Sequence, residues 1–272
     1  MARAAYQNQE PVPRLIGVVH LPALPGSPLH RGGLQAVIDA AARDATALAE
    51  AGFDAVLVEN FGDVPFVPGS VGAVTVAAMT ACALAVRRAA PAPALGINVL
   101  RNDAEAALAI AVAAGAAFIR INVHTGARVT DQGVIEGRAD RTLRERRRLG
   151  AEAVRLLCDV DVKHSAPLAP RPIAEEAHDL VTRGLADAVL VTGSGTGRSA
   201  ARADLDAVLD AVDVPVLVAS GVTEGGLADV ARAHGVVVGS ALRRSGRAGD
   251  PVDAELAKRF AEAFRASRTS AS

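Results

Sequence analysis

One junction recurs along this 272-residue chain and constrains its fold more than any other feature. The segments AEAGFDAVLVEN, VAAGAAFIRINV and VTRGLADAVLVT each pass from an Ala-rich stretch to an apolar run through a glycine, at Gly52, Gly115 and Gly184. Glycine tolerates the left-handed conformation that ends many helices. The runs that follow are almost continuously apolar, which is typical of parallel strands buried on both faces. The junction therefore predicts repeated helix-to-strand units.

The same alternation extends over the whole chain. Strands are predicted at 15–20, 55–59, 94–99, 118–123, 154–163, 188–191, 215–219 and 236–239, and helices at 34–51, 71–90, 104–114, 141–150, 173–183, 203–211, 225–233 and 253–266. Eight such units without a long linker predict an α/β fold, a single (β/α)₈ TIM barrel over residues 15–266, with an N-terminal extension at 1–14 and a frayed tail at 267–272. A doubly wound sheet is the competing layout, but LIGVVHLPALPGSP at the first strand lacks the Gly-rich dinucleotide fingerprint.

Composition argues against several classes of protein. The 29 Lys and Arg residues nearly balance the 30 Asp and Glu residues, and only 3% of the chain is aromatic, so nucleic-acid binding is not expected. Cys82 and Cys158 are too few for a disulfide scaffold, and we expect both to be reduced and packed. No segment reads as a secretion signal or a membrane-spanning helix, which predicts a cytoplasmic protein. Ala-rich helices with few aromatic residues further suggest a homo-oligomer.

Polar residues collect where the predicted strands end. A barrel of this kind carries its active site at the carboxyl ends of its strands and in the loops that follow. The positions concerned are His20, Glu59, Asn60, Asn98, Arg120, Asn122 and Asp159. Because the strand interiors stay apolar, this pattern predicts a small-molecule site.

Three loops in the last third of the chain are rich in Gly and Ser. They supply Gly193, Ser194, Gly195, Thr196 and Gly197 after the sixth strand, Ser220 and Gly221 after the seventh, and Gly239 and Ser240 at the eighth. Glycine lets backbone N–H groups approach an anion closely, and a following helix turns its positive end to the same place. Barrel enzymes often bind phosphate between the last two of these loops, after strands 7 and 8. We therefore expect a phosphorylated small-molecule ligand, although the same glycines also suit tight turns.

The fifth strand ends in CDVDVKHSAPL, which concentrates charge. Alternate residues of a strand share a face, so Asp159, Asp161 and Lys163 are predicted to project together, with His164 opposite or in the loop. Lys163 there suits an electrostatic clamp, a proton-transfer group or a Schiff-base former, or else a plain ion pair. Because neighbouring carboxylates raise the pKa of a lysine, charge stabilisation or proton transfer is favoured.

The remaining strand-end residues suggest roles. Glu59 and His20 end adjacent strands and make an acid–base pair, or else supporting hydrogen bonds. Asn98, Arg120 and Asn122 suit the orientation of hydroxyl groups or an oxyanion. The candidate catalytic residues are thus His20, Glu59, Asn98, Arg120, Asn122, Asp159 and Lys163.

No cofactor is expected. A divalent metal held by His20, Glu59, Asp159 and Asp161 is the weaker alternative, since the spacing of a metal site is absent. His124, His178 and His234 are predicted to be solvated, and the basic run at 141–150 reads as the exposed face of a helix.

The sequence also resembles a known family. LIGVVHLPALPGSP, DAVLVENFGDVPF, LGINVLRND, FIRINVHTG, VTDQGVIEGRA, DVKHSAPL and TGSGTG together resemble the BtpA/SgcQ family from Arg14 to Leu242. The resemblance implies a ribulose-phosphate-binding type of barrel. The family takes its name from a cyanobacterial factor needed for photosystem I to accumulate, while other members are predicted enzymes. Its polar positions fall on His20, Glu59, Asn60, Asn98, Arg120, Asn122, Asp159, Lys163 and His164, without established roles.

Three functions follow as hypotheses. The first is an enzyme acting on a phosphorylated sugar or nucleoside-like molecule, as an isomerase, a lyase or a nucleosidase-like hydrolase. The second, implied by the family name alone, is a photosystem I biogenesis factor that reaches the membrane through a protein partner. The third is a phospho-ligand sensor without catalysis. The density of polar strand ends favours the enzyme, although a fold alone does not assign function.

Overall fold

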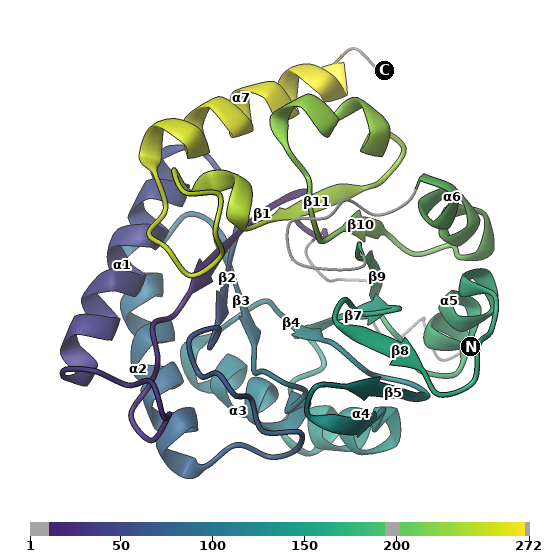
Figure 1. The fold of residues 1–272 in the computed structure, drawn as a ribbon, viewed down its shortest axis with the longest axis horizontal. Coiled ribbons are helices and arrows are strands. Elements are labelled where there is room, and N and C mark those ends of the chain that lie inside the picture. The colour runs from purple at the N-terminus through teal and green to yellow at the C-terminus, as the bar shows by residue number, and fades with distance from the viewer. Residues whose placement is uncertain (1–10, 194–201, 270–272) are drawn as a thin grey trace.

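The computed structural model describes residues 11–193 and 202–269, and within them parallel strands close the expected barrel (Figure 1). The barrel strands are β1 (Leu15–His20), β2 (Ala55–Glu59), β3 (Ala94–Asn98), β4 (Phe118–Ile121), β7 (Arg155–Val160), β9 (Ala188–Val191), β10 (Val216–Val218) and β11 (Gly235–Val238). Each pairs in parallel with its neighbours in chain order, and β1 closes the ring against β11. The predicted fold class is confirmed.

Helices surround the barrel on its outer face (Figure 1). They are α1 (Leu34–Glu50), α2 (Ala73–Ala89), α3 (Ala104–Ala114), α4 (Ala139–Arg148), α5 (Ile173–Thr182), α6 (Arg202–Ala211) and α7 (Ala254–Thr269). The helix predicted at 225–233 is wrong, because two 3₁₀ turns replace it, η2 (Glu224–Gly226) and η3 (Ala228–Val230). The paired glycines in that segment disfavour an α-helix. A further 3₁₀ turn, η4 (Ser240–Leu242), follows β11.

Alternate residues of the strands divide the core into two parts. Val56 and Val58 of β2 belong to the larger core between barrel and helices, whereas Ala55 and Leu57 belong to the smaller core inside the barrel. Glu59, two residues after Leu57, continues the inward series. The same alternation brings the polar ends of the strands to one layer of the barrel interior. Beneath that layer, the smaller core forms an apolar plug that fills the barrel.

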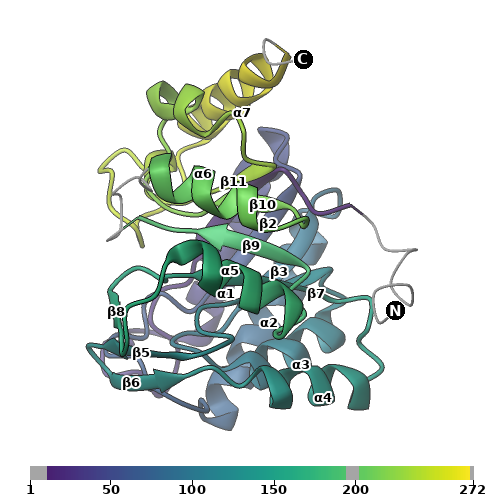
Figure 2. The same ribbon diagram turned by 90° about the vertical axis from the view of Figure 1, so that its right-hand side faces the viewer.

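A second, smaller sheet was not predicted. It consists of β5 (Ala127–Thr130), β6 (Gly133–Glu136) and β8 (Ser165–Pro167), which pair antiparallel in the order β6-β5-β8. Figure 2 shows this sheet at the end of the barrel toward which the strands point, while the chain enters β1 from the opposite end. The loops after β4 and β7 are thereby joined across the rim of the barrel.

The helix-ending glycines follow the prediction at two of three junctions. Gly52 and Gly115 have φ of +80° and +67°, the left-handed region. Gly184 does not, and Leu185 takes that conformation instead, with φ of +55°. Gly184 is needed for space, since a Cβ there would lie 2.6 Å from the carbonyl oxygen of Leu180.

Three further expectations about buried and terminal residues need correction. His124 is not solvated but 1% exposed, with Nε2 2.8 Å from the carbonyl oxygen of Gly184. Arg146, on the helix predicted to be an exposed basic face, is buried, and one of its guanidinium nitrogens lies 3.2 Å from an Asp187 oxygen. Val12, within the predicted extension, packs into the barrel interior, and α7 continues to Thr269.

Two other features concern cysteines and membranes. Cys82 and Cys158 are buried free thiols, and burial raises the pKa of the Cys82 thiol to about 12. Among the helices of the described residues, none has the length and apolar character to cross a bilayer.

Candidate functional site

A buried ion-pair cluster occupies the top layer of the barrel interior. Arg120 of β4 donates to both carboxylate oxygens of Asp159 on β7, from Nε at 3.1 Å and from a terminal nitrogen at 3.0 Å. Its other terminal nitrogen lies 3.8 Å from Oε2 of Glu59 on β2. Burial opposes the charge of Arg120, but the two carboxylates outweigh it and hold its pKa above the ordinary value. All three side chains are at most 6% exposed.

Two asparagines hold the carboxylates in place. Asn98 Nδ2 on β3 donates to Glu59 Oε2 at 3.1 Å, and Asn122 Nδ2 donates to Asp159 Oδ2 at 2.7 Å. An ionised carboxylate only accepts hydrogen bonds, so this contact fixes the orientation of the Asn122 amide. Its Oδ1 is then left buried and, within the described residues, without a hydrogen-bond partner. The predicted shared face of Arg120 and Asn122 is observed.

His20 lies beside this cluster as a neutral imidazole. The N–H of Gly249 donates to its Nδ1 at 3.3 Å, so the ring proton is on Nε2. Burial, and next the positive charge of Arg243, lower the pKa of His20 well below its ordinary value. A Cβ on Gly239 would lie 3.0 Å from the His20 ring, so glycine there allows the loop to approach the imidazole closely.

Lys163 reaches the site by a different path from the predicted one. The strand predicted to run to residue 163 ends at Val160, because Asp161 takes a left-handed conformation with φ of +51°. Thr192 Oγ1 fixes this turn by donating to the carbonyl oxygen of Asp161 and accepting from the N–H of Lys163, each at 3.0 Å. Asp161 and Lys163 therefore do not share a strand face.

The electrostatic setting of Lys163 also differs from the expectation. Burial is the largest influence and lowers its pKa, and Arg120 lowers it further, against the opposite effect of Glu59. Within the described residues no carboxylate lies within ion-pair distance of its ammonium group. Carboxylates do raise the pKa of Lys163, as expected, but burial and Arg120 outweigh them, so the argument against amine chemistry at Lys163 does not hold.

The loops after β10 and β11 present backbone donors to the same region. Within the described residues, no hydrogen bond uses the N–H of Gly221, Gly239 or Ser240. Beneath them, the fully buried Arg243 donates to the carbonyl oxygens of Gly239, of Val18 at 2.7 Å and of Asp250 at 3.1 Å. A buried positive charge thus supports a loop with unused donors, a combination suited to an anion.

One narrow cavity connects the polar cluster with these loops. It is lined on one side by His20, Glu59, Arg120 and Lys163, and on the other by Ser220, Gly221, Gly239 and Ser240. The structure therefore brings together two groups of residues that the sequence analysis proposed separately. Asn98, Asn122 and Asp159 adjoin this cavity through their hydrogen bonds to its lining residues.

Several expected site residues do not line this narrow cavity. Asn60 is buried and bonds the backbone of Leu100, with Oδ1 2.7 Å from its N–H, so it joins the loops after β2 and β3. Asp161 is exposed and pairs with Arg128 of the small sheet. His164 is exposed and lines the barrel mouth next to Lys163. Gly193 follows β9 and is buried, whereas Ser194, Gly195, Thr196 and Gly197 lie outside the described residues.

The described part of the chain holds no cluster of three or more His, Cys, Asp or Glu side chains placed for a metal ion. Glu59 and Asp159 are instead engaged with Arg120 and the asparagines.

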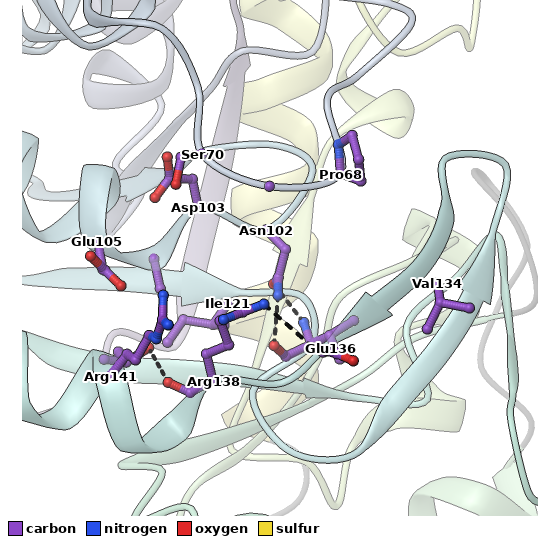
Figure 3. A pocket seen from close by; sticks show the side chains of 14 residues that line it. Pro68, Ser70, Asn102, Asp103, Glu105, Ile121, Val134, Glu136, Arg138 and Arg141 are labelled. Atoms are coloured by element: carbon purple, nitrogen blue, oxygen red, sulfur yellow. Dashed lines mark hydrogen bonds and ion pairs between the residues drawn. The ribbon is translucent and has the colours of Figure 1, made fainter.

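A separate cavity, lined by fourteen residues, lies outside the barrel mouth (Figure 3). Figure 3 shows Asn102 and Asp103 at the start of α3, between the loop at Ser70 and the start of α4. Asn102 exchanges two 2.8 Å hydrogen bonds with the backbone of Val123. Asp103 accepts from the N–H groups of Val71 and Ala106 at 2.8 and 3.0 Å. These polar groups are used in joining loops to α3, so the barrel mouth is the better candidate site.

Comparison with known proteins identifies the family. The model of the BtpA family matches residues 12–266. The chain belongs to the BtpA family. An uncharacterized protein of Thermococcus kodakarensis is 46% identical over 94% of this chain and 97% of the relative. The photosystem I biogenesis protein BtpA of Synechocystis is 44% identical over 95% of this chain and 89% of the relative. The resemblance noted from the sequence is confirmed.

Solved barrels of low sequence identity share the fold of this BtpA family member. Thiamine phosphate pyrophosphorylase from Pyrococcus furiosus matches with a TM-score of 0.58 at 12% identity, over 93% of this chain and 96% of that one. The geranylgeranylglyceryl phosphate synthase of Thermoplasma acidophilum, in complex with sn-glycerol-1-phosphate, matches with a TM-score of 0.58 at 15% identity, over 97% and 96%. At these identities the likeness establishes the fold alone.

The structure also places residues at the mouth of this BtpA family member that sequence reasoning missed. Arg243 follows the eighth strand and supports the glycine loop. Arg101 follows the third strand, is 5% exposed, and donates to the carbonyl oxygen of Lys163 at 2.8 Å. Phe61 packs against His20 with ring centroids 4.5 Å apart. The available signal was position in the sequence, since each of the three lies in the segment that follows a barrel strand.

Proposed function

We propose that this protein is an enzyme acting on a phosphorylated sugar or nucleoside-like small molecule, bound at the carboxyl end of the barrel. The observation that carries the proposal is the narrow cavity shared by Glu59, Arg120 and Lys163 with Gly221 and Gly239. Titratable groups and unused backbone donors in one cavity are the combination expected of an active site.

The glycine loops form the anion-binding side in this proposal. The N–H groups of Gly221, Gly239 and Ser240 donate to phosphate oxygens, and the buried charge of Arg243 makes the surrounding potential positive. The Nε2–H of the neutral His20 adds a donor beside Gly239. A barrel of this fold has been solved with a phosphorylated substrate, sn-glycerol-1-phosphate.

The polar cluster forms the reacting side. Glu59 is oriented by Asn98, which leaves its carboxylate to take a proton as a base. Lys163, with its lowered pKa, returns a proton, or its neutral amine adds to a substrate carbonyl carbon and forms a Schiff base as the carbonyl oxygen leaves as water. Isomerisation, lyase chemistry and cleavage of a glycosidic bond can each use a positioned acid and base of this kind. Arg120, fixed by Asp159, supplies positive charge where an oxyanion develops.

Anion binding is tested with ribose 5-phosphate and inorganic phosphate by isothermal titration calorimetry. We expect Ser240→Asp to weaken ribose 5-phosphate binding at least tenfold, because it places a carboxylate beside the phosphate. Ser70→Asp introduces the same charge on an exposed residue of the loop after β2 and should leave binding unchanged. Thermal unfolding confirms that both variants fold. Equal binding by the Ser240→Asp variant and the unmodified protein would refute the phosphate site.

Catalysis is tested on any phosphorylated sugar or nucleotide that the protein is shown to convert. Glu59→Gln and Lys163→Met should each lower kcat by about 100-fold or more, as loss of an acid–base group does. Turnover that survives both substitutions contradicts the assignment of these residues. Binding of a phosphorylated ligand with no turnover of any compound favours the sensor instead.

The name of the Synechocystis relative favours a second candidate function, photosystem I biogenesis. Complementation of a cyanobacterium that lacks its own BtpA separates the two. Rescue by the unmodified chain but not by Lys163→Met makes the biogenesis role depend on the proposed site. Rescue by both assigns it to another surface.

A further inference from the structure

A second, larger cavity adjoins the first at the barrel mouth. The two share Glu59, Arg120 and Lys163 as lining residues. The first measures about 30 Å³ and the second about 430 Å³. A ligand that fills both must therefore place a compact group against the glycine loops and its bulk in the larger cavity.

The larger cavity is lined by the scarce aromatic residues of the chain. Only six phenylalanines occur, with no Trp, and four of them are buried in the core, at Phe53, Phe118, Phe260 and Phe264. The other two, Phe61 and Phe66, are partly exposed and both line this cavity, together with Val64 and Leu100. Partly exposed rings that converge on one cavity, while every other Phe is packed, indicate a surface for an apolar or planar group.

Polar atoms without partners mark the edge of the same cavity. Nε of Arg101 and Oδ1 of Asn122 are buried and have no hydrogen-bond partner within the described residues, and both residues line it. Asp159 fixes the Asn122 amide, and the carbonyl oxygen of Lys163 holds the Arg101 guanidinium. One free donor and one free acceptor are costly to bury, so a ligand that supplies an acceptor and a donor is expected.

The two requirements select one ligand chemistry. A saturated chain satisfies the Phe rings but not the polar atoms, and a bare sugar phosphate satisfies the polar atoms but leaves the rings uncovered. A planar nitrogen heterocycle has an apolar face for stacking and a polar edge with both donors and acceptors. Phe61 also contacts His20, which lines the first cavity, so the ring surface continues directly into the anion side.

We propose that the substrate is a sugar phosphate that carries a planar nitrogen heterocycle, with the phosphate on the glycine loops and the heterocycle against Phe61 and Phe66. The sugar then passes Glu59, Arg120 and Lys163, which the two cavities share. This inference rests on the proposed function and narrows its substrate class.

The test compares four probes by calorimetry: ribose 5-phosphate, a nucleoside 5′-monophosphate, the same nucleoside without phosphate, and hexyl phosphate. We expect the monophosphate to bind at least tenfold more tightly than ribose 5-phosphate and than hexyl phosphate. Equal affinities for the monophosphate and ribose 5-phosphate overturn the heterocycle while leaving the proposed function intact. Failure of all the phosphorylated probes to bind overturns both proposals.

Variants of Phe66 connect the affinity to the ring. Phe66→Ala and Phe66→Leu should both lower the affinity for the nucleoside monophosphate to that for ribose 5-phosphate. The affinity for ribose 5-phosphate itself should not change. Val129→Ala, at an exposed apolar residue of the small sheet, is the matched control and should keep the higher affinity for the monophosphate. If the Phe66→Leu variant still binds the monophosphate more tightly than ribose 5-phosphate, and hexyl phosphate binds as tightly as the monophosphate, the cavity takes an alkyl chain. The proposal of a heterocycle is then wrong.

Discussion

Two layers of the barrel interior are built by the same strands and have opposite chemistry. In β2, β4 and β7 the inward-facing pairs, two positions apart, are Leu57 and Glu59, Phe118 and Arg120, and Leu157 and Asp159. The first member of each pair is apolar and packs with the other residues of the plug, whereas the second joins the ion-pair cluster. Both layers are almost fully buried.

The two layers differ in how much they contribute to the stability of the barrel. Burial of apolar side chains stabilises a fold, but a buried ion pair does so weakly, because the desolvation of the two charges offsets their attraction. Apolar residues of similar size would fill the upper layer equally well. The proposed ligand site accounts for its polar character, and the two layers should respond differently to substitution.

The largest effect is expected in the apolar layer. Phe118→Ala should lower the free energy of unfolding by about 4 kcal/mol, because it removes a buried ring and leaves a cavity. The ring fills the space left by Gly96, where a Cβ would lie 2.2 Å from it. Denaturant unfolding measures the loss. The folded fraction of the variant should still bind ribose 5-phosphate, and a loss of below 1 kcal/mol would show that the plug does not carry the stability.

Removing one partner from the polar layer should be nearly as costly. Arg120→Leu leaves Asp159 and Glu59 buried without their cation, so we expect a loss of about 3 kcal/mol. The double variant Arg120→Leu/Asp159→Leu should recover a large part of it, since the pair is then replaced by apolar groups. Neither variant should bind ribose 5-phosphate. If the double variant were the less stable of the two, the polar layer would be a net source of stability.

A smaller effect on stability is expected from His20, and only at acidic pH. Its pKa is lowered in the folded protein, mainly by burial, so the unfolded chain takes up a proton more readily. The contribution of neutral His20 to stability is complete above about pH 6.5 and is lost as the pH falls toward the folded pKa. His20→Gln should thus show a shallower fall of Tm below pH 6.5. His178→Gln, at an exposed position, is the control and should keep the full slope.

The smallest change in stability is expected for Lys163→Met. Within the described residues this ammonium group has no ion-pair partner, and burial lowers its pKa, so its removal should shift the free energy of unfolding by less than about 0.5 kcal/mol. A destabilisation above about 2 kcal/mol would instead assign Lys163 to the framework of the upper layer.

The strands and most helices could be predicted because their signals are local. Apolar runs and their glycine junctions define the strands wherever the chain lies in space, and Glu59, Arg120 and Asp159 were found because strand ends share one rim. The prediction was wrong where a local pattern competes with distant contacts. The strand through Asp161 is ended by Thr192, thirty-one residues away, and the small sheet pairs Val129 with Ala166.

The sequence by itself determined a closed barrel with one apolar and one polar interior layer, because a period of two along each strand sets which side chains face inward. Only the tertiary structure decided what that polar layer contains. It showed that burial, not neighbouring carboxylates, governs the pKa of Lys163, and that Phe61 and Phe66 line a cavity beside it. Desolvation and cavity shape depend on which distant segments pack together, and no spacing of residues along the chain contains that information.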